Sequence, residues 1–338
     1  MGRALRIAAW GALLVAIVAA GWLRLPWYGV GPGPAFDVAP LVRFDELQRF
    51  DPGGRLVITT VRWRQLTPIT ALQAWVDDAW EIVPREELYP PELDRDEEER
   101  ISFAQMDQSQ IHAMSVVLSR LTEYPKDHDD GVLVEGTYPP CPADGVLFPG
   151  EIVTAIDGVE IDSREEASEL IDAAPVGEPL AFEVRSGDEE RAVELARERC
   201  IVGERRAYVG VGFANVFPVD VRIEDQAVGG PSAGLMFALG LYDLLTPGDL
   251  TAGATIAGTG TLDLDGVVGP IGSIRDKVVA AERAGASLFI VPEANRSELD
   301  GVDLGDLRLV PVGSFDEAIE ALLAEGGTDE GRAMPLDA

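Results

Sequence analysis

The sequence Gly229-Gly230-Pro231-Ser232-Ala233-Gly234 stands directly before an apolar run at residues 235–242. That run is long enough to form a buried helix, which places the serine at the start of the helix. Helix starts present unpaired backbone N–H groups and the positive end of the helix dipole, and both stabilise a developing oxyanion. The stretch alone fits two interpretations, a nucleophilic serine and a loop serine that caps the helix.

Lysine usage favours the nucleophile. Lysine occurs only at Lys126 and Lys277, although Lys and Arg together number 27. Arginine cannot give up its proton near neutral pH, whereas a desolvated lysine can. We expect Lys277 on the apolar face of a helix that Ser273 caps, in a capping box with Asp276. Lys277 is therefore a candidate general base for Ser232, and the alternative is a lysine that snorkels from the edge of the core.

Residues 205–325 contain four motifs in order: GPSAG at 230–234, IAGTGTL at 256–262, DGVVGPIG at 265–272 and RDK at 275–277. With these motifs, the segment resembles the proteolytic domain of Lon-type serine peptidases. This resemblance implies a Ser-Lys dyad, with Ser232 as the nucleophile and Lys277 as the general base. It makes Thr259 a neighbour that hydrogen-bonds the lysine, and it makes Gly230, Pro231 and Ala233 supporting residues.

Two positions depart from the Lon pattern. Many Lon enzymes have Asp where this chain has Gly229, and a second glycine where it has Ser273. Neither departure removes the dyad. We expect Gly229 to leave the approach to the serine open and so to alter substrate access.

Composition and motif content exclude several other functions. The net charge of -32 argues against nucleic acid as a partner, and it also fits a saline habitat. The only histidines, His112 and His128, lie far upstream of Ser232, so a Ser-His-Asp triad is not expected. The sequence has no HExxH motif, paired-cysteine ligand set or Walker A motif. It therefore predicts no metal, no cofactor and no ATPase.

The amino terminus predicts a membrane anchor. Residues 7–23 are uncharged and apolar, with Arg3 and Arg6 before them and Arg24 after them. At 17 residues the stretch is short for a spanning helix and long for a signal-peptide core. We expect an uncleaved, single-pass helix with its amino terminus in the cytoplasm and the rest of the chain outside. A cleaved signal is the alternative.

Residues 130–200 resemble a PDZ domain, on the strand GVLV at 131–134, the segment PGEIVTAIDG at 149–158 and a helix at 163–173. The resemblance implies a groove that adds a peptide strand to a sheet edge. The peptide-facing strand would be Gly131, Val132, Leu133 and Val134. Because the loop at 126–130 is acidic and should repel a carboxylate, a packing or oligomer-gating module remains the alternative. Cys141 and Cys200, the only cysteines, could form one disulfide outside the cytoplasm.

The expected fold is therefore α+β, with a transmembrane helix, a PDZ-like β-rich domain and a Lon-type proteolytic domain of mixed sheet and helices. The expected function is a membrane-tethered, extracytoplasmic, ATP-independent serine endopeptidase that cleaves unfolded or exported proteins. A homo-oligomeric ring is implied by resemblance. The alternative is a catalytically inactive, tethered peptide-binding scaffold. The predicted divisions are an anchor at 1–28, an α/β segment packing on later domains at 29–125, the PDZ-like domain at 126–202, the proteolytic domain at 203–325 and a frayed tail at 326–338.

Overall fold

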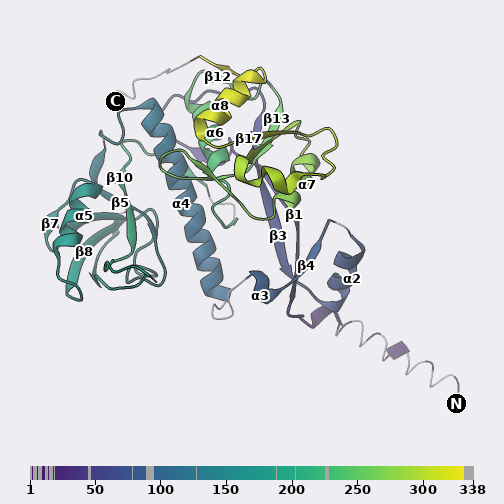
Figure 1. Cartoon of the computed structure of the whole chain (residues 1–338), viewed down its shortest axis with the longest axis horizontal. Coiled ribbons are helices and arrows are strands. Elements are labelled where there is room, and N and C mark those ends of the chain that lie inside the picture. The colour runs from purple at the N-terminus through teal and green to yellow at the C-terminus, as the bar shows by residue number, and fades with distance from the viewer. Residues whose placement is uncertain are drawn as a thin grey trace.

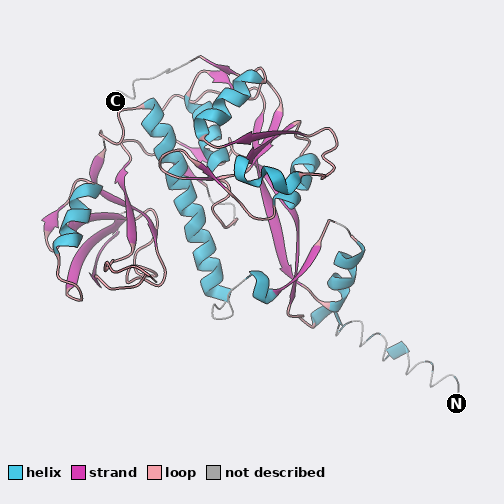
Figure 2. Cartoon of the chain, viewed as in Figure 1, coloured by secondary structure: helices cyan, strands magenta, loops and turns pink. Residues whose placement is uncertain are grey.

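The structure is a computed structural model that describes residues 2, 6, 10, 11, 14, 18, 20–44, 47–77, 79–88, 95–126, 128–187, 189–201, 203–224 and 228–330. Within these residues, two six-stranded sheets form the centres of two globular parts. The long helix α4 (Arg95–Leu121) runs between the two parts (Figure 1). Helices surround the first sheet, whereas the second part is mostly strand (Figure 2).

The first sheet combines strands from both ends of the chain, in the order β17-β16-β13-β3-β1-β4. The four strands β17, β16, β13 and β3 are parallel, while β1 is antiparallel to β3 and to β4. The strands are β1 (Trp27–Asp37), β3 (Arg55–Gln65), β4 (Glu81–Pro84), β13 (Thr255–Gly258), β16 (Leu288–Pro292) and β17 (Arg308–Val312).

This sheet is buried on both faces because its strands are apolar at successive positions. Leu56 and Ile58 of β3 point to one face and share a core with helix α6 (Gly234–Leu245). Val57, between them, points to the other face and shares a core with helix α7 (Ile274–Arg283). The result is a three-layer arrangement with α6 and α7 on opposite sides. The other helices of this part are α2 (Pro68–Val76), α3 (Arg85–Leu88), the 3-10 helix η1 (Glu293–Leu299) and α8 (Phe315–Ala324).

The second sheet has the order β10-β5-β6-β8-β9, with β7 paired to β6, and all of its pairs are antiparallel. One helix, α5 (Arg164–Ala173), accompanies it, and Ser163 caps this helix by accepting a hydrogen bond from Glu166 N–H. The strands are β5 (Asp129–Thr137), β6 (Ile152–Ile156), β7 (Val159–Glu160), β8 (Pro179–Ser186), β9 (Glu189–Ala196) and β10 (Val211–Val216). Three two-stranded pairs complete the described strands: β2 (Val42–Arg43) with β11 (Arg222–Ile223), β12 (Gly248–Asp249) with β18 (Thr328–Asp329), and β14 (Thr261–Leu262) with β15 (Val268–Gly269).

The strand pairing corrects the predicted peptide-facing strand. Gly131, Val132, Leu133 and Val134 belong to β5, and β5 has β10 on one side and β6 on the other. Val132 and Leu133 are paired on both sides, so they cannot accept a peptide strand. Among the described strands, β10 pairs only with β5, so β10 is one of the two edge strands in the order β10-β5-β6-β8-β9. The PDZ resemblance predicted this strand as the peptide-facing one, but an edge strand and a central strand differ only in their tertiary pairing.

The strand order of the two sheets also differs from the predicted domain boundaries. Residues 27–84 give three strands to the first sheet, and the second sheet, at 129–216, is an insertion between those strands and the rest of the same sheet. Strand β10 falls inside the predicted proteolytic segment 203–325 yet belongs to the second sheet. Part of the predicted frayed tail is ordered, because β18 pairs with β12. The rest of that tail, 331–338, lies outside the described residues.

The predicted transmembrane helix is wrong. Among the residues that the structure describes, no helix has both the length and the apolar character needed to cross a bilayer. Most of the stretch at 7–23 lies outside the described residues. Its length gives a physical reason, since 17 helical residues span about 25 Å and a hydrocarbon core is about 30 Å thick.

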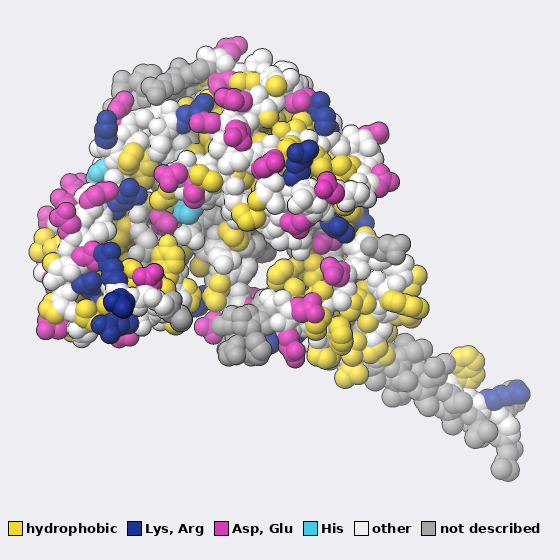
Figure 3. Space-filling view, viewed as in Figure 1, with side chains coloured by type: hydrophobic (Ala, Val, Ile, Leu, Met, Phe, Trp, Pro, Cys, Tyr) yellow, Lys and Arg dark blue, Asp and Glu magenta, His cyan; other side chains and the backbone are white. Residues whose placement is uncertain are grey.

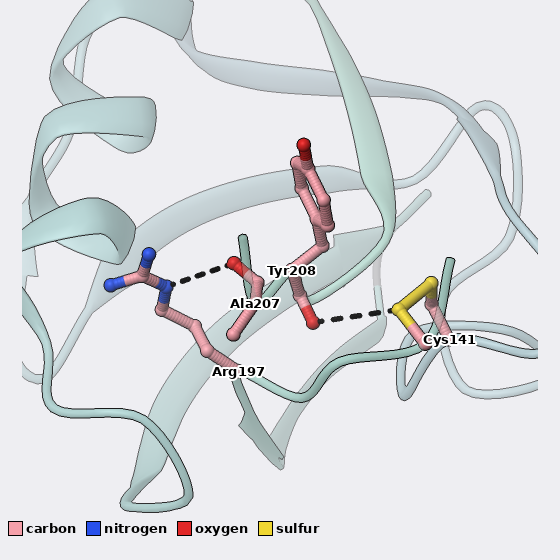
Figure 4. The surroundings of a disulfide bond; sticks show 5 residues. Cys141, Arg197, Ala207 and Tyr208 are labelled. Atoms are coloured by element: carbon pink, nitrogen blue, oxygen red, sulfur yellow. Dashed lines mark hydrogen bonds between the residues drawn. A yellow bond between two sulfur atoms is a disulfide. The ribbon is translucent and has the colours of Figure 1, made fainter. Parts of the chain in front are cut away.

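Cys141 and Cys200 form a disulfide with a Cα–Cα distance of 5.0 Å. Figure 4 shows its surroundings, where the Sγ atom of Cys200 lies 3.9 Å from the carbonyl oxygen of Tyr208. The Nε–H of Arg197 donates to the carbonyl of Ala207, at 3.3 Å. The two contacts hold neighbouring residues of the segment that leads into β10.

We predict that Cys141→Ala with Cys200→Ala lowers the free energy of unfolding of the second sheet by about 4 kcal/mol, because the bridge closes a loop with a sequence separation of 59. Amide hydrogen exchange of peptides from β8 and β9 measures this loss, and peptides from β16 serve as the internal control. Wild-type protein kept in reductant should show the same loss. Unchanged protection of β8 and β9 in the double variant would contradict the prediction.

Candidate active site

The site forms where the short parallel strand β13 ends. Thr259 follows the last residue of β13 and is almost fully buried, at 1% exposure. Ser232 reaches this point from the loop before α6, on one face of the sheet, and Lys277 reaches it from α7, on the other face. The carboxyl end of parallel strands is a common place for a site, because side chains from both faces can meet beyond the last strand residue.

Hydrogen bonds join the three side chains. The Nζ atom of Lys277 lies 2.6 Å from Ser232 Oγ and 2.9 Å from Thr259 Oγ1. Thr259 Oγ1 donates its proton to the carbonyl of Ser232, at 2.9 Å. The N–H of Gly260 donates to the same carbonyl, also at 2.9 Å. The backbone of the serine is thereby tied to the strand that carries the threonine.

This pattern orients the lysine amine. Because the hydroxyl proton of Thr259 is given to the Ser232 carbonyl, Thr259 Oγ1 offers a lone pair to an N–H of Lys277. A neutral amine that donates one proton there can turn its own lone pair toward Ser232 Oγ. The serine hydroxyl then donates to Nζ, which is the arrangement that general-base activation requires.

Burial adjusts the protonation of Lys277. Its side chain is 3% exposed and lies on the α7 face that shares a core with Ile274 and Val278. Desolvation by this burial lowers the pKa of Lys277 from 10.5 to about 7. A large fraction of the Lys277 side chains therefore carries a neutral amine near pH 7, so strongly alkaline conditions are not needed to form it.

The supporting residues of the loop hold the turn before α6. Gly230 has φ +89, a conformation that favours glycine, and its N–H donates to the carbonyl of Ser102 on α4, at 2.8 Å. The carbonyl of Pro231 accepts from the hydroxyl of Ser109, also on α4, at 3.1 Å. Ala233 occupies the N-cap position of α6, and no side chain caps the helix there.

Gly229 has a packing role in addition to its predicted effect on substrate access, which stays a prediction. A Cβ atom at this position would lie 2.0 Å from Ser102 Oγ and 2.9 Å from Ser102 Cβ. The glycine is needed because α4 approaches the loop closely, so an aspartate here would collide with α4. No sequence pattern predicts this contact, because Ser102 and Gly229 are far apart in the chain.

Ser273 also differs from its predicted role. It is the N-cap residue of α7, but its backbone is left-handed, with φ 53 and ψ 42, and its side chain makes no cap hydrogen bond. The predicted capping box with Asp276 is therefore absent from this helix start. A left-handed backbone explains why glycine suits this position in the Lon pattern. Burial, with the nearby charge of Glu81, raises the pKa of Asp276 to about 6.

A cavity of about 920 Å³ opens in front of Ser232 and Lys277. Its lining includes residues 58–63 of β3, residues of α4 between 98 and 106, the loop at 228–233 and the segment at 270–273 before α7. Beyond Ile58, β3 continues past the end of β13, so its last residues lie along the cavity without β13 beside them. Sequence reasoning did not place β3 or α4 at this cavity, because neither carries a motif.

A second cavity, of about 420 Å³, lies along the edge strand β10 and beside α5. Its lining includes Ile171 of α5, the segment at 206–213 and Tyr138. Arg206 forms an ion pair with Asp172 of α5 across this cavity. The structure thus places a groove at β10, next to the disulfide. Of the predicted residues 131–134, Leu133 lines a different cavity, of about 530 Å³, together with Ile152 and Val216.

The histidines lie outside the Ser232 cavity lining. His112 Nδ1–H donates to the carbonyl of Leu262 on β14, at 2.8 Å, and its Nε2 lies 3.2 Å from Glu135 on β5. Burial lowers the pKa of His112, but hydrogen bonds to Glu135 and Leu262 outweigh it and raise the pKa above 6.5. Within the described part of the chain, no group of three or more His, Cys, Asp or Glu residues could hold a metal ion. Acidic side chains are spread over the visible surface (Figure 3).

Comparison with known proteins identifies the segment that carries Ser232 and Lys277. Residues 211–325 match the Lon protease (S16) C-terminal proteolytic domain. A Lon protease 1 from Myxococcus xanthus is 34% identical over 127 residues, which are 36% of this chain and 15% of the relative. A peroxisomal Lon protease homolog 2 from Xenopus laevis is 41% identical over 101 residues, 29% of this chain and 11% of the relative. These relatives support a serine peptidase, and the chain spans only a small part of their length.

Among solved structures, the PDZ domain of the SdrC-like protein from Listeria monocytogenes is similar to part of the chain. It is 25% identical, with a TM-score of 0.24, and the match covers 26% of this chain and 92% of that one. The PDZ domain of the SdrC-like protein from Listeria innocua gives 25% identity and a TM-score of 0.23, covering 25% of this chain and 93% of that one.

We predict that the rate at which a fluorophosphonate labels Ser232 rises with pH through a midpoint near 7 and then levels off. Only the neutral amine can take the serine proton, and the neutral fraction of Lys277 grows as pH passes its lowered pKa of about 7.

Hydrogen bonds to Glu135 and Leu262 raise the pKa of His112 above 6.5, so the control is His112→Gln with His128→Gln. The rising limb should persist in this double variant. A limb that vanishes there, or a midpoint near the free-lysine value of about 10.4, would contradict the assignment to Lys277.

Proposed function

We propose that this chain is an ATP-independent serine endopeptidase that cleaves unfolded or exported proteins with a Ser232-Lys277 dyad. The observation that carries the proposal is the 2.6 Å separation between Ser232 Oγ and the buried Nζ of Lys277. The Lon match of residues 211–325 supports the reaction class. The chain carries no Walker A motif, which is why the proposal includes no ATP hydrolysis.

The proposed chemistry is acyl transfer. Neutral Lys277 takes the proton of Ser232 as Oγ forms a bond to the peptide carbonyl carbon. The resulting ammonium then gives that proton to the leaving amine as the C–N bond breaks, which leaves an ester on Ser232. Water then attacks the ester carbonyl carbon while Lys277 takes a proton from the water. The ammonium returns this proton to Ser232 Oγ as the Oγ–C bond breaks, so the acid product departs and the neutral amine is restored. Thr259 touches the amine throughout and keeps its lone pair directed at Oγ.

The oxyanion donors are assigned by elimination among the amides at the start of α6. The N–H groups of Gly230 and Leu235 already donate to carbonyls of Ser102 and Gly260. Pro231 has no N–H. The proposed donors are therefore the N–H groups of residues 232–234, where the helix dipole adds a favourable field.

The second cavity is proposed to bind extended peptide. Strand β10 is an edge strand whose open side lies beside α5, and such an edge can take a peptide as a further strand. Arg206 at this cavity offers a positive charge, although Asp172 already pairs with it. Peptide binding here also favours the second candidate function, an inactive peptide-binding scaffold.

An extracytoplasmic location is part of the proposal. The disulfide Cys141–Cys200 supports it, because disulfides persist in oxidising compartments. The proposed function does not include membrane attachment, because the only argument for it was the predicted spanning helix. A ring of identical subunits stays a prediction from the Lon resemblance.

We predict that Ser232→Ala and Lys277→Arg each abolish cleavage of a fluorescently labelled unstructured protein. Arginine keeps the charge and approximate size of lysine but supplies no lone pair near neutral pH. The matched control is Lys126→Arg, which makes the same change at the only other lysine and should keep wild-type kcat/KM.

Fluorophosphonate labelling separates the two candidate functions. The endopeptidase should be labelled in the wild type and not in Ser232→Ala. A folded wild-type chain that is never labelled would favour the scaffold. Substantial cleavage by Lys277→Arg would exclude the dyad even if Ser232 is the nucleophile.

A further inference from the structure

Helix α4 makes two hydrogen bonds to the loop that carries the nucleophile. The carbonyl of Ser102 accepts from Gly230 N–H at 2.8 Å, and the hydroxyl of Ser109 donates to the carbonyl of Pro231 at 3.1 Å. These bonds hold the two residues that immediately precede Ser232. Helix α4 lies outside residues 211–325, so it is not part of the matched proteolytic segment.

The contact between α4 and the loop is close and buried. Ser109 is 2% exposed, and it lies seven residues, or about two helical turns, after Ser102, which puts both on one side of α4. A Cβ atom at Gly234 would lie 2.8 Å from Ser109 Oγ, and one at Gly229 would lie 2.0 Å from Ser102 Oγ. Glycines at both ends of the loop thus allow α4 to reach the backbone beside Ser232.

The backbone around Ser232 is consequently held from two directions. On one side, Ser109 holds the carbonyl of Pro231. On the other side, Thr259 and the N–H of Gly260 hold the carbonyl of Ser232 itself. The Pro231 carbonyl precedes the Cα atom of Ser232 and the Ser232 carbonyl follows it. Holding both carbonyls fixes the serine backbone, and the backbone sets where Oγ lies relative to Lys277.

We propose that Ser109 is a positioning residue for the nucleophile, acting through the Pro231 carbonyl to keep Ser232 Oγ within hydrogen-bond distance of Lys277. The inference rests on the proposed peptidase function. A displacement of about 1 Å at a reacting atom can reduce the rate about 100-fold without weakening substrate binding. Ser109 acts on the loop and does not touch the reacting atoms.

The test is Ser109→Ala in the full chain, measured by kcat, by KM and by the rate of fluorophosphonate labelling. We expect kcat and the labelling rate to fall about 10- to 100-fold, with KM within about twofold of the wild type. The matched control is Ser115→Ala. Ser115 is on the same helix and 3% exposed, but it lies beside Tyr124 and away from the loop, so kcat and labelling should not change.

A pH profile distinguishes positioning from simple loss of stability. Without the Ser109 bond the loop loosens, water reaches Lys277, and the midpoint of the labelling rate should move to higher pH. A loss of folded protein would lower the amplitude and leave the midpoint in place. Thermal unfolding of each variant gives the folded fraction.

If Ser109→Ala does not fold, Gly229→Ala takes its place, because the added Cβ pushes α4 from the loop while Ser109 remains. It should give the same loss of kcat with unchanged KM. Wild-type kcat and labelling in a folded variant, or a loss that matches the unfolded fraction, would overturn the positioning role. An inactive wild type would instead overturn the proposed function and this inference with it.

Discussion

The candidate site depends on one constraint: the lysine amine must be excluded from water while it contacts a serine hydroxyl. An ammonium in such a place loses its hydration, so the chain has to surround Lys277 with apolar residues and still admit Ser232 and Thr259. The three-layer architecture meets this requirement. Helix α7 carries the lysine on its buried face, and the end of β13 brings Thr259 beneath it.

Sequence reasoning reached those parts of the site whose spacing is local. Ser232 before an apolar helix and Lys277 on an apolar helix face both leave a periodic signal, and the structure brings the two side chains together. The partners from α4 leave no such signal, because Ser109 and Pro231 are separated by 122 residues. The sequence also does not distinguish an edge strand from a central one. For this reason β5 was predicted to bind a peptide strand, although β10 lies at the edge of the sheet. The predicted spanning helix is wrong because no helix among the described residues is long and apolar enough to cross a bilayer.

Helix α4 belongs structurally to both globular parts. Ser109 of this helix contacts the loop that carries Ser232. Gln108 and His112 of the same helix approach Glu135 of β5 in the second sheet. His112 also holds the carbonyl of Leu262, which follows Thr259 by three residues. The second sheet is therefore joined to the site by side chains of a single rigid element as well as by the chain itself.

The pairing of β3 with β13 affects how the protein is made. Arg55 and Thr255 are register partners and lie 200 residues apart, so β3 leaves the ribosome long before its neighbour exists. At about 5–20 residues per second, the delay is roughly 10–40 s. During that time the nascent chain presents an apolar strand with an unpaired edge, while the inserted second sheet can already form from a continuous segment. Ser232 and Lys277 meet only after β13 and α7 have been synthesised, so a nascent chain that stops before them has no assembled site.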